Sequence, residues 1–229
     1  MKKIAVLTGA GISQESGIKT FRDADGLWEG HDVMEVASPQ GWARNPSLVL
    51  DFYNQRRRLL HEVQPNLAHI TLAELESQYA VTIITQNIDD LHERGGSTNI
   101  IHLHGELLKS RGVKYPYEVY DQPGDINLGD MCPKGSQLRP HIVWFGEAVP
   151  MLEQAVPVVA GADIVIIIGT SMQVYPAAGL VGLAQNHADI YYIDPRPAIN
   201  HELSLVRNLE VIEAKATAGV RDLADRLLG

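Results

Sequence analysis

Cysteine and positive charge are both scarce in this sequence. Cys132 is the single cysteine among 229 residues, which excludes an internal disulfide framework and suits a reducing compartment, so we expect a cytoplasmic protein. The chain has 19 Lys and Arg against 28 Asp and Glu, a formal net charge of −9. Without a lysine-rich tail or stripe to hold a phosphate backbone, direct nucleic-acid binding is not expected.

Long hydrophobic runs are also missing. The run that starts at Ile4 ends before Gly9, short of the roughly seven to fifteen apolar residues of a signal peptide. The run from Ile164 to Ile168 is far too short to cross a bilayer. We therefore expect a soluble protein that does not associate with a membrane.

The apolar runs that are present are continuous rather than alternating, as in strands covered on both faces. They span residues 4–7, 81–84, 164–168 and 190–193. Helical patterns lie between them at about residues 65–78, 151–160, 175–186 and 217–228. This alternation predicts an α/β fold with a Rossmann-like, doubly wound parallel sheet, in one domain over residues 1–229.

Two stretches interrupt the alternation and are interpreted as insertions that form a small lobe. Residues from about 26 to 63 hold a loop and then one amphipathic helix, opened by Asn45 as a capping residue and Pro46 at the first helical position. Residues from about 110 to 137 are rich in Gly, Pro, Asp and Tyr and show little periodicity.

The segment 9–17 (GAGISQESG) directly follows the first predicted strand. At that place a helix N-terminus, with its unpaired amides, commonly meets a dinucleotide phosphate. Gly9 and Gly11 would let the backbone approach a phosphate without a Cβ in the way. A tight turn without a ligand also uses glycine, so this segment alone leaves both explanations open.

Blocks further along the chain favour nucleotide binding. They are GIKTFR at 17–22, GLW at 26–28, TQNID at 85–89, HLHGE at 102–106, PHIVWFGE at 140–147 and GTS at 169–171. With GAGIS at 9–13, this ordered set closely resembles the sirtuins, the NAD-dependent protein lysine deacylases, over nearly the whole chain. A dehydrogenase is disfavoured because the glycine spacing is not that of the usual hydride-transfer fingerprint.

The resemblance implies an enzyme that uses NAD and acylated-lysine proteins or peptides, transferring the acyl group to ADP-ribose and releasing nicotinamide. His104 matches the family's catalytic histidine, and imidazole suits a general base because its unperturbed pKa is about 6.5. No protein nucleophile is required, in agreement with the lack of a Ser/His/Asp or Cys/His signature. Protein mono-ADP-ribosylation or NAD hydrolysis uses the same chemistry and stays open as the alternative function. Intact Asn87, Asp89 and His104 disfavour a non-catalytic NAD sensor.

Asn87, grouped with His104 as catalytic, and Asp89 are implied to hold the nicotinamide carboxamide, because an amide needs both a donor and an acceptor. Without the resemblance, an aspartate at 89 or 90 that caps a short helix is the simpler interpretation. His102 shares a side with His104 if this segment is a strand, and it is taken as structural. The residues implied to contact NAD are Gly9, Ala10, Gly11, Ser13, Thr20, Phe21, Arg22, Trp28, Gln86, Asn87, Ile88, Asp89, Gly169, Thr170, Ser171, Asp194 and Ala216.

Two segments resemble the strands between which sirtuins clamp an extended substrate peptide. They contribute Phe145, Gly146 and Glu147, and Val174 and Tyr175. Taken by itself, the apolar part of the first segment is more typical of a protein core.

Tyr53 and Arg56 lie three residues apart on the predicted amphipathic helix and so share a face. They match the pair found in sirtuins of the desuccinylase and demalonylase type, and Ala37 falls where that subgroup widens its acyl pocket. Arginine binds a carboxylate bidentately, and a tyrosine hydroxyl adds one hydrogen bond. The alternative is a solvated basic face, since Arg56 begins a run of three arginines.

The sequence departs from the family in two places. Most sirtuins hold a zinc with two cysteine pairs, whereas the interval between His104 and His141 contains only Cys132 and no histidine, so we expect no metal. Asp194 and Arg196 stand where the family usually reads the adenosine ribose with Asn-x-Glu. Without zinc, the insertion is expected to be held by other contacts. Tyr115, Tyr117 and Tyr120 are candidates for a small aromatic cluster, and the alternative is that these tyrosines are exposed in a loop.

Overall fold

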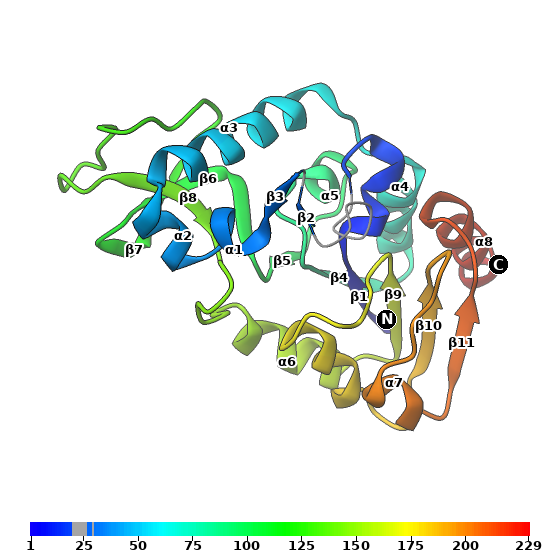
Figure 1. Ribbon diagram of the computed structural model, residues 1–229. Helices are drawn as coiled ribbons and strands as arrows, with labels where there is room; N and C mark the ends of the chain where they lie inside the picture. Colours follow the sequence, from blue (N-terminus) through cyan, green and yellow to red (C-terminus); the bar gives the residue numbers. More distant parts are fainter. Residues whose placement is uncertain (20–26, 29) are drawn as a thin grey trace.

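The computed structural model describes residues 1–19, 27–28 and 30–229. A six-stranded sheet with the order β11-β10-β9-β1-β4-β5 dominates the larger lobe (Figure 1). All of its strand pairs are parallel, which confirms the predicted Rossmann-like α/β fold. Its strands are β1 (Lys3–Thr8), β4 (Ala80–Thr85), β5 (Ile100–His102), β9 (Ile164–Ile168), β10 (Asp189–Ile193) and β11 (Leu209–Ile212).

The sheet is covered on both faces because alternate side chains of each strand enter different cores. Ala5 and Leu7 of β1 pack with one core, whereas Ile4 and Val6 pack with the other. The first core includes side chains of α6 (Leu152–Ala160), η4 (Ala177–Leu183) and α7 (His201–Leu205). The second includes side chains of α4 (Leu67–Glu74), η3 (Leu75–Ser77) and α8 (Ala216–Leu228).

The smaller lobe lies at the other end of the molecule (Figure 1). It contains the strand pair β2 (Leu27–Trp28) and β3 (His31–Asp32), and an antiparallel sheet in the order β7-β6-β8. The strands of that sheet are β6 (Gly105–Gly112), β7 (Tyr115–Asp121) and β8 (Leu138–Ile142). Its helices are α1 (Val33–Val36), α2 (Pro39–Arg44) and α3 (Pro46–Glu62).

Several predicted elements agree with the structure. Asn45 caps α3, its side chain accepting the amide of Leu48, and Pro46 is the first helical residue. The helix predicted over 65–78 is present as α4 and η3, and it starts after the capping residue Asn66. The helices predicted at about 151–160 and 217–228 are α6 and α8.

Other predictions were wrong. The helix expected over 175–186 is the 3-10 segment η4, in a sequence that contains two glycines, Gly179 and Gly182, which weaken an α-helix. The loop expected at 26–63 also contains α1 and α2. The stretch 110–137, which shows little periodicity, holds β7 and the end of β6. β6 and β7 pair as a local antiparallel hairpin, and the preference of a sequence for such strands depends on the surfaces that they pack against.

Within the described residues, no helix has the length and apolar character needed to cross a membrane.

Candidate functional site

The candidate site lies at the carboxyl ends of β1, β4, β9 and β10, where ligands bind in open parallel sheets (Figure 1). Backbone hydrogen bonds tie these strand ends together. The Gly9 amide donates to the Ile168 carbonyl at 3.1 Å, and the Gln86 amide donates to the Thr8 carbonyl at 2.9 Å. The residues that directly follow β1, β4 and β9 are therefore held close to one another.

The glycines of the first turn are required by backbone packing. A Cβ on Gly11 would lie 2.6 Å from the Gly169 Cα atom, and a Cβ on Gly9 would lie 2.8 Å from the Thr170 Cβ atom. Gly169 itself has a φ of +59°, a conformation that favours glycine. The turn continues into two 3-10 helices, η1 (Ala10–Ile12) and η2 (Gln14–Ser16), rather than into the expected α-helix. Close backbone packing in a tight turn is therefore enough to require glycine at positions 9 and 11, with or without a bound nucleotide.

Ser13, Asn87 and Asp89 form a buried polar group beside this turn. The Asn87 side-chain amide donates to the Gly9 carbonyl and to the Ser13 hydroxyl oxygen, both at 3.2 Å. The Ser13 hydroxyl donates to Asp89 Oδ2 at 3.0 Å, and burial raises the pKa of Asp89 to about 6. Asp89 also accepts the Leu91 amide, at the first residue of α5 (Leu91–Arg94), whereas Asp90 is the N-cap residue and its side chain makes no capping hydrogen bond.

His104 follows β5 and lies close to the same strand ends. Its Nδ1 atom is 3.0 Å from the Gln86 carbonyl oxygen. A carbonyl only accepts, so Nδ1 carries the proton and Nε2 is the unprotonated nitrogen of the neutral ring. Burial lowers the pKa of His104, although the bond to Gln86 opposes this shift. At neutral pH the ring is therefore in the form that a general base requires.

His102 has a different environment from His104, because β5 ends at His102 and the period-two relation does not extend to His104. His102 Nε2 lies 2.7 Å from Glu93 Oε1, and Nδ1 lies 3.3 Å from the Asn87 carbonyl oxygen. Burial is the largest single influence and acts to lower the pKa of His102, but the hydrogen bond to Glu93, the charges of Glu93 and Glu106 and the bond to the Asn87 carbonyl together outweigh it, so the pKa is raised.

Among the described residues, Glu93, His102 and Glu106 make the one group whose potential metal-ligand atoms lie within 4.8 Å of one another. They line a cavity of about 250 Å³ together with Asp89. The Lys109 ammonium donates to Glu106 at 2.9 Å, and Glu93 pairs with His102, so the carboxylates of this group already have cationic or imidazole partners.

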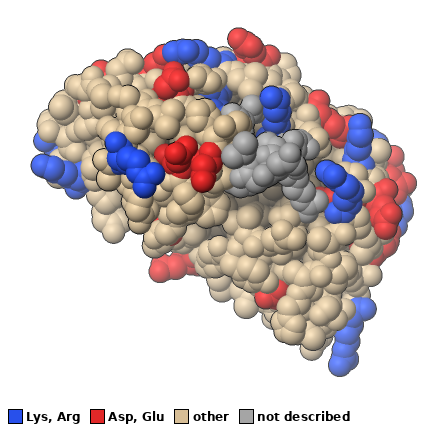
Figure 2. All heavy atoms as spheres, viewed as in Figure 1, with Lys and Arg blue, Asp and Glu red and all other residues tan. Residues whose placement is uncertain are grey.

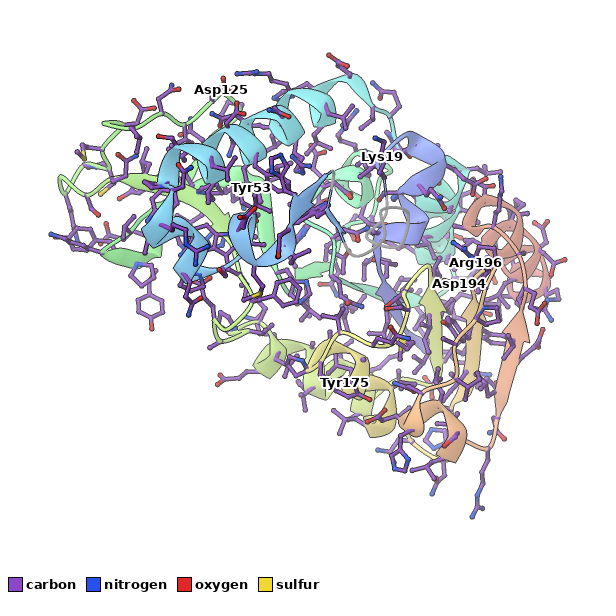
Figure 3. The ribbon with its side chains drawn as sticks, in the orientation of Figure 1. Lys19, Tyr53, Asp125, Tyr175, Asp194 and Arg196 are labelled. Atoms are coloured by element: carbon purple, nitrogen blue, oxygen red, sulfur yellow. The ribbon has the colours of Figure 1, made fainter. Side chains whose placement is uncertain are left out.

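The adenosine side of the expected cofactor site consists of residues after β9 and β10. Gln86 Nε2 donates to the Thr170 hydroxyl at 3.1 Å, next to Ser171. Asp194 and Arg196 lie side by side beyond the end of β10 (Figure 3), and Asp194 Oδ1 accepts the Arg196 amide at 2.8 Å. Ala216 is the buried first residue of α8 and packs in the second core.

Tyr53 and Arg56 both belong to α3, but their side chains have different partners. Tyr53 is fully buried inside the smaller lobe (Figure 3), and its hydroxyl accepts a hydrogen bond from Trp144 Nε1 at 3.1 Å. The Arg56 guanidinium lies over the Phe52 ring and 5.4 Å from the Trp28 ring centroid. Trp28 also packs edge-on against Tyr53, so the structure places Trp28 with this pair.

Of the three arginines at 56–58, Arg58 is exposed, Arg56 is half-buried and Arg57 is buried. Arg57 is 1% exposed and donates to the Leu107 carbonyl and to Asn54 Oδ1, and burial lowers its pKa to about 10. Arg58 pairs with Asp125. Ala37 is buried in the same core as Tyr53, and its carbonyl accepts the Phe145 amide at 2.9 Å.

The two predicted peptide-clamp segments are accessible. Phe145 is 42% exposed and Tyr175 is 56% exposed, and Val174 and Gly146 are exposed too. On the face seen in Figure 2, Lys, Arg, Asp and Glu of the described residues are interspersed around a largely uncharged area. The Glu147 side chain, in contrast, has internal partners: it accepts from Arg139, Arg111 and the Trp144 amide. Any contact of Glu147 with a peptide would therefore come from its backbone.

The insertion at 110–137 is held by the polar side of α3. Asn54 donates to the Ile126 carbonyl and accepts the Ile126 amide, both at 2.9 Å. His61 Nε2 lies 2.8 Å from the Pro123 carbonyl oxygen. The suggested aromatic cluster is absent from this fully described insertion, since no ring contact joins the three tyrosines and Tyr117 is 93% exposed.

Thr20, Phe21 and Arg22 lie outside the described residues. Trp144 is buried in a hydrophobic core, and its indole N–H also donates to the Tyr53 hydroxyl, a polar role that the sequence pattern does not show. Arg139 was not singled out. Its position near Trp144 and Glu147 results from the strand β8 and the following turn, which the sequence pattern does not reveal.

The comparisons with known proteins agree with this arrangement. The family model described as Sir2 family matches residues 9–176. An NAD-dependent protein deacylase of Helicobacter pylori is 60% identical over 228 residues, covering 100% of this chain and 98% of its own. One of Bacteroides thetaiotaomicron is 51% identical over 234 residues, covering 100% and 99%.

Solved structures are similar over almost the whole chain. A Sir2 homologue in complex with NAD has a TM-score of 0.88 and 38% identity, covering 99% of this chain and 90% of that chain. A complex of Sir2 with a p53 peptide and NAD⁺ has a TM-score of 0.80 and 27% identity, covering 98% and 92%. With the family model over residues 9–176 and relatives above 50% identity over its full length, the chain belongs to the Sir2 family.

Proposed function

We propose that this chain is an NAD-dependent protein deacylase that acts on acylated lysine, including succinyl-lysine and malonyl-lysine as well as acetyl-lysine. The observation that carries the proposal is His104, a neutral imidazole held by the Gln86 carbonyl next to the Ser13, Asn87 and Asp89 group. The full-length relatives named NAD-dependent protein deacylase support the same activity.

The residues at the strand ends fit NAD. Within the described residues, Asn87 Oδ1 accepts no hydrogen bond, and the Asp89 carboxyl beside it has a pKa raised to about 6. Together they offer acceptor groups for the N–H side of an amide, whereas the side-chain N–H groups of Asn87 are directed to Gly9 and Ser13 and fix its orientation. When bound, NAD supplies the ADP-ribose that receives the acyl group, with release of nicotinamide.

His104 has the properties of the base in this scheme. Its Nδ1 proton is directed to Gln86, so Nε2 is available to remove a proton from a ribose hydroxyl. The lowered pKa keeps this nitrogen unprotonated at neutral pH. The protein's other contribution is to position the two substrates and to exclude water from the reacting atoms.

The acidic acyl groups are assigned from α3. Tyr53 provides a neutral hydroxyl, because burial raises its pKa, and Arg56 on the same helix provides a guanidinium that suits a carboxylate. Two segments provide backbone groups for an extended peptide: Phe145, Gly146 and Glu147 on one side, and Val174 and Tyr175 on the other. Acylated proteins or peptides are therefore the proposed substrates. The single cysteine supports a cytoplasmic setting.

The test is a panel of acetyl-, malonyl- and succinyl-lysine peptides, each with and without NAD, with products identified by mass spectrometry. O-acyl-ADP-ribose and free lysine are expected, and His104→Tyr should abolish both. His187→Tyr is the matched control, because His187 is exposed. ADP-ribosylated protein, or ADP-ribose without deacylation, would instead establish the alternative function.

Arg56→Met separates the acyl assignment from the activity itself. Loss of the guanidinium should reduce turnover of the succinyl and malonyl peptides much more than turnover of the acetyl peptide. Equal turnover of all three peptides by wild type and variant would show that the acyl assignment is wrong, while the deacylase assignment stands.

A further inference from the structure

The hydrogen bond between Trp144 and Tyr53 joins two residues that are 91 positions apart in the sequence. Trp144 Nε1 donates to the Tyr53 hydroxyl oxygen at 3.1 Å. Both side chains are buried, with Tyr53 at 0% and Trp144 at 2% exposure. An indole has one donor and no acceptor, so the direction of this bond is fixed.

This bond determines what the Tyr53 hydroxyl can do. The hydroxyl oxygen accepts from the indole, and its own proton must therefore point to another acceptor. Within the described residues the Tyr53 hydroxyl donates to no protein atom. Arg56 lies one helical turn away on α3, and the two residues together are the proposed contacts of the acyl carboxylate. The phenolic proton is thus left for an acceptor such as that carboxylate.

Trp144 is itself held rigidly from three sides. The Arg139 guanidinium carbon lies 3.2 Å from the centroid of the Trp144 ring, and the Trp42 ring packs at 5.7 Å. Arg139 also pairs with both oxygens of Glu147, at 2.7 and 3.1 Å. Glu147 Oε2 in turn accepts the Trp144 backbone amide at 2.9 Å. The indole N–H is therefore fixed by a charged network as well as by packing.

We propose that Trp144 is a positioning residue for acidic acyl groups: its indole N–H fixes the Tyr53 hydroxyl so that the phenolic proton is directed to the acyl carboxylate. The proposal rests on the acidic-acyl part of the proposed function. Trp144 acts through Tyr53, and an acetyl group, which has no carboxylate, does not use this hydrogen bond. The effect of replacing Trp144 on the deacylation rate should consequently depend on both the acyl group and the Tyr53 hydroxyl.

A double-mutant cycle tests both dependences. Trp144→Phe, Tyr53→Phe and the double variant are assayed for kcat/KM on succinyl- and acetyl-lysine peptides of one sequence. Trp144→Phe should lower desuccinylation about fivefold, the effect of one neutral hydrogen bond, and should leave deacetylation within about twofold. In the Tyr53→Phe background, Trp144→Phe should change desuccinylation by less than about twofold, because the hydroxyl it positions is gone.

Two additional variants separate this role from loosened packing. Trp42→Phe is the matched control, since Trp42 packs on the Trp144 ring and makes no hydrogen bond to Tyr53, and it should leave the succinyl-to-acetyl ratio unchanged. Benzothienylalanine at position 144 replaces the indole N–H with sulfur at nearly constant shape. It should reproduce the selective loss seen with Trp144→Phe even if the phenylalanine variant folds poorly.

The outcomes distinguish the two proposals. An equal loss on acetyl and succinyl peptides, or an equal effect of Trp144→Phe with and without the Tyr53 hydroxyl, would overturn the positioning role alone. A wild-type enzyme that deacetylates but does not desuccinylate would overturn the acidic-acyl assignment and this inference together.

Discussion

The imidazole of His104 is oriented by the backbone of Gln86: Nδ1 lies 3.0 Å from the Gln86 carbonyl oxygen. The side chain of the same residue donates to Thr170 at 3.1 Å. Gln86 therefore connects the proposed base, His104, to the loop after β9. His104 and this loop lie at the edge of the sheet where β1, β4 and β9 end.

The pH dependence of kcat/KM follows from the environment of His104. The neutral ring is the active form, and burial lowers the pKa of His104 below its ordinary value of 6.5. Activity should thus persist as the pH falls through 6.5 and decline only at lower pH. A profile on acetyl-lysine peptide at saturating NAD measures this acid limb.

Asp89 is the control for that profile, because burial raises its pKa to about 6 and it could produce a limb of its own. In Asp89→Asn the residual activity should keep an acid limb at the wild-type position. A wild-type limb centred at pH 7 or above would contradict the assignment to His104.

Gly11→Ala should disrupt the fold of the first turn. The added Cβ would lie 2.6 Å from the Gly169 Cα atom, in backbone that has little room to move. We expect a loss of about 2 to 3 kcal/mol in the free energy of unfolding, as for overpacked core positions, measured by urea denaturation. Gly124→Ala is the control because a Cβ added there would have no neighbour within 4 Å, and it should change stability by less than about 0.5 kcal/mol.

The sheet could be predicted because its information is local. Continuous apolar runs mark β1, β4, β9 and β10, and motifs after these strands mark the ligand edge. The antiparallel β6-β7-β8 sheet was missed because β7 is half exposed, with Tyr117 in solvent, and lacks a clear alternation. β11 was missed for a similar reason, since Val211 is exposed.

Within the site, residue types were predictable and their partners were not. The HLHGE block indicates His104, but its orienting group is a backbone carbonyl, which no side-chain pattern reveals. The bond from Trp144 to Tyr53 joins α3 to the segment after β8 and depends on tertiary packing. For the same reason the run at 56–58 resembled a solvated face, although Arg57 is buried and donates to the Leu107 carbonyl of β6 and to Asn54.

Stability should fall with acid because of the buried histidines His69 and His92. Their rings are 4.9 Å apart, and burial lowers the pKa of His69 to about 4. Between pH 6.5 and 4 the unfolded chain binds more protons than the folded one, so unfolding is favoured as the pH falls. From His69 alone the loss between pH 7 and pH 5 should be on the order of 2 kcal/mol.

Thermal or urea unfolding at pH 7 and pH 5 measures this loss. In His69→Gln the difference between the two pH values should shrink, even though the variant is less stable at pH 7. His187→Gln alters an exposed histidine and should leave the difference unchanged. A wild-type stability that is flat from pH 7 to pH 5 would show that His69 does not titrate as expected.

Zinc should be absent from the purified protein, because the interval between His104 and His141 offers one thiol and no imidazole, too few to close a structural zinc site. Elemental analysis should find well below one zinc per chain. Prolonged dialysis against EDTA should leave the Tm and the deacylase rate unchanged. A chelator that lowered the Tm by several degrees would point to a metal with a different ligand set.

Asn54 should hold the insertion at 110–137 against α3. It is buried, and it satisfies both backbone groups of Ile126 while accepting from Arg57 at 2.7 Å. Asn54→Ala leaves these three polar groups without their partner, so a loss on the order of 3 kcal/mol is expected, with faster hydrogen exchange at the Ile126 amide. Gln55→Ala, at the next position of α3, removes only an exposed bond to Asp51 and should change neither quantity. If the two variants were equally stable, the insertion would depend on contacts other than this side chain, and the buried Arg57 would be the next residue to replace.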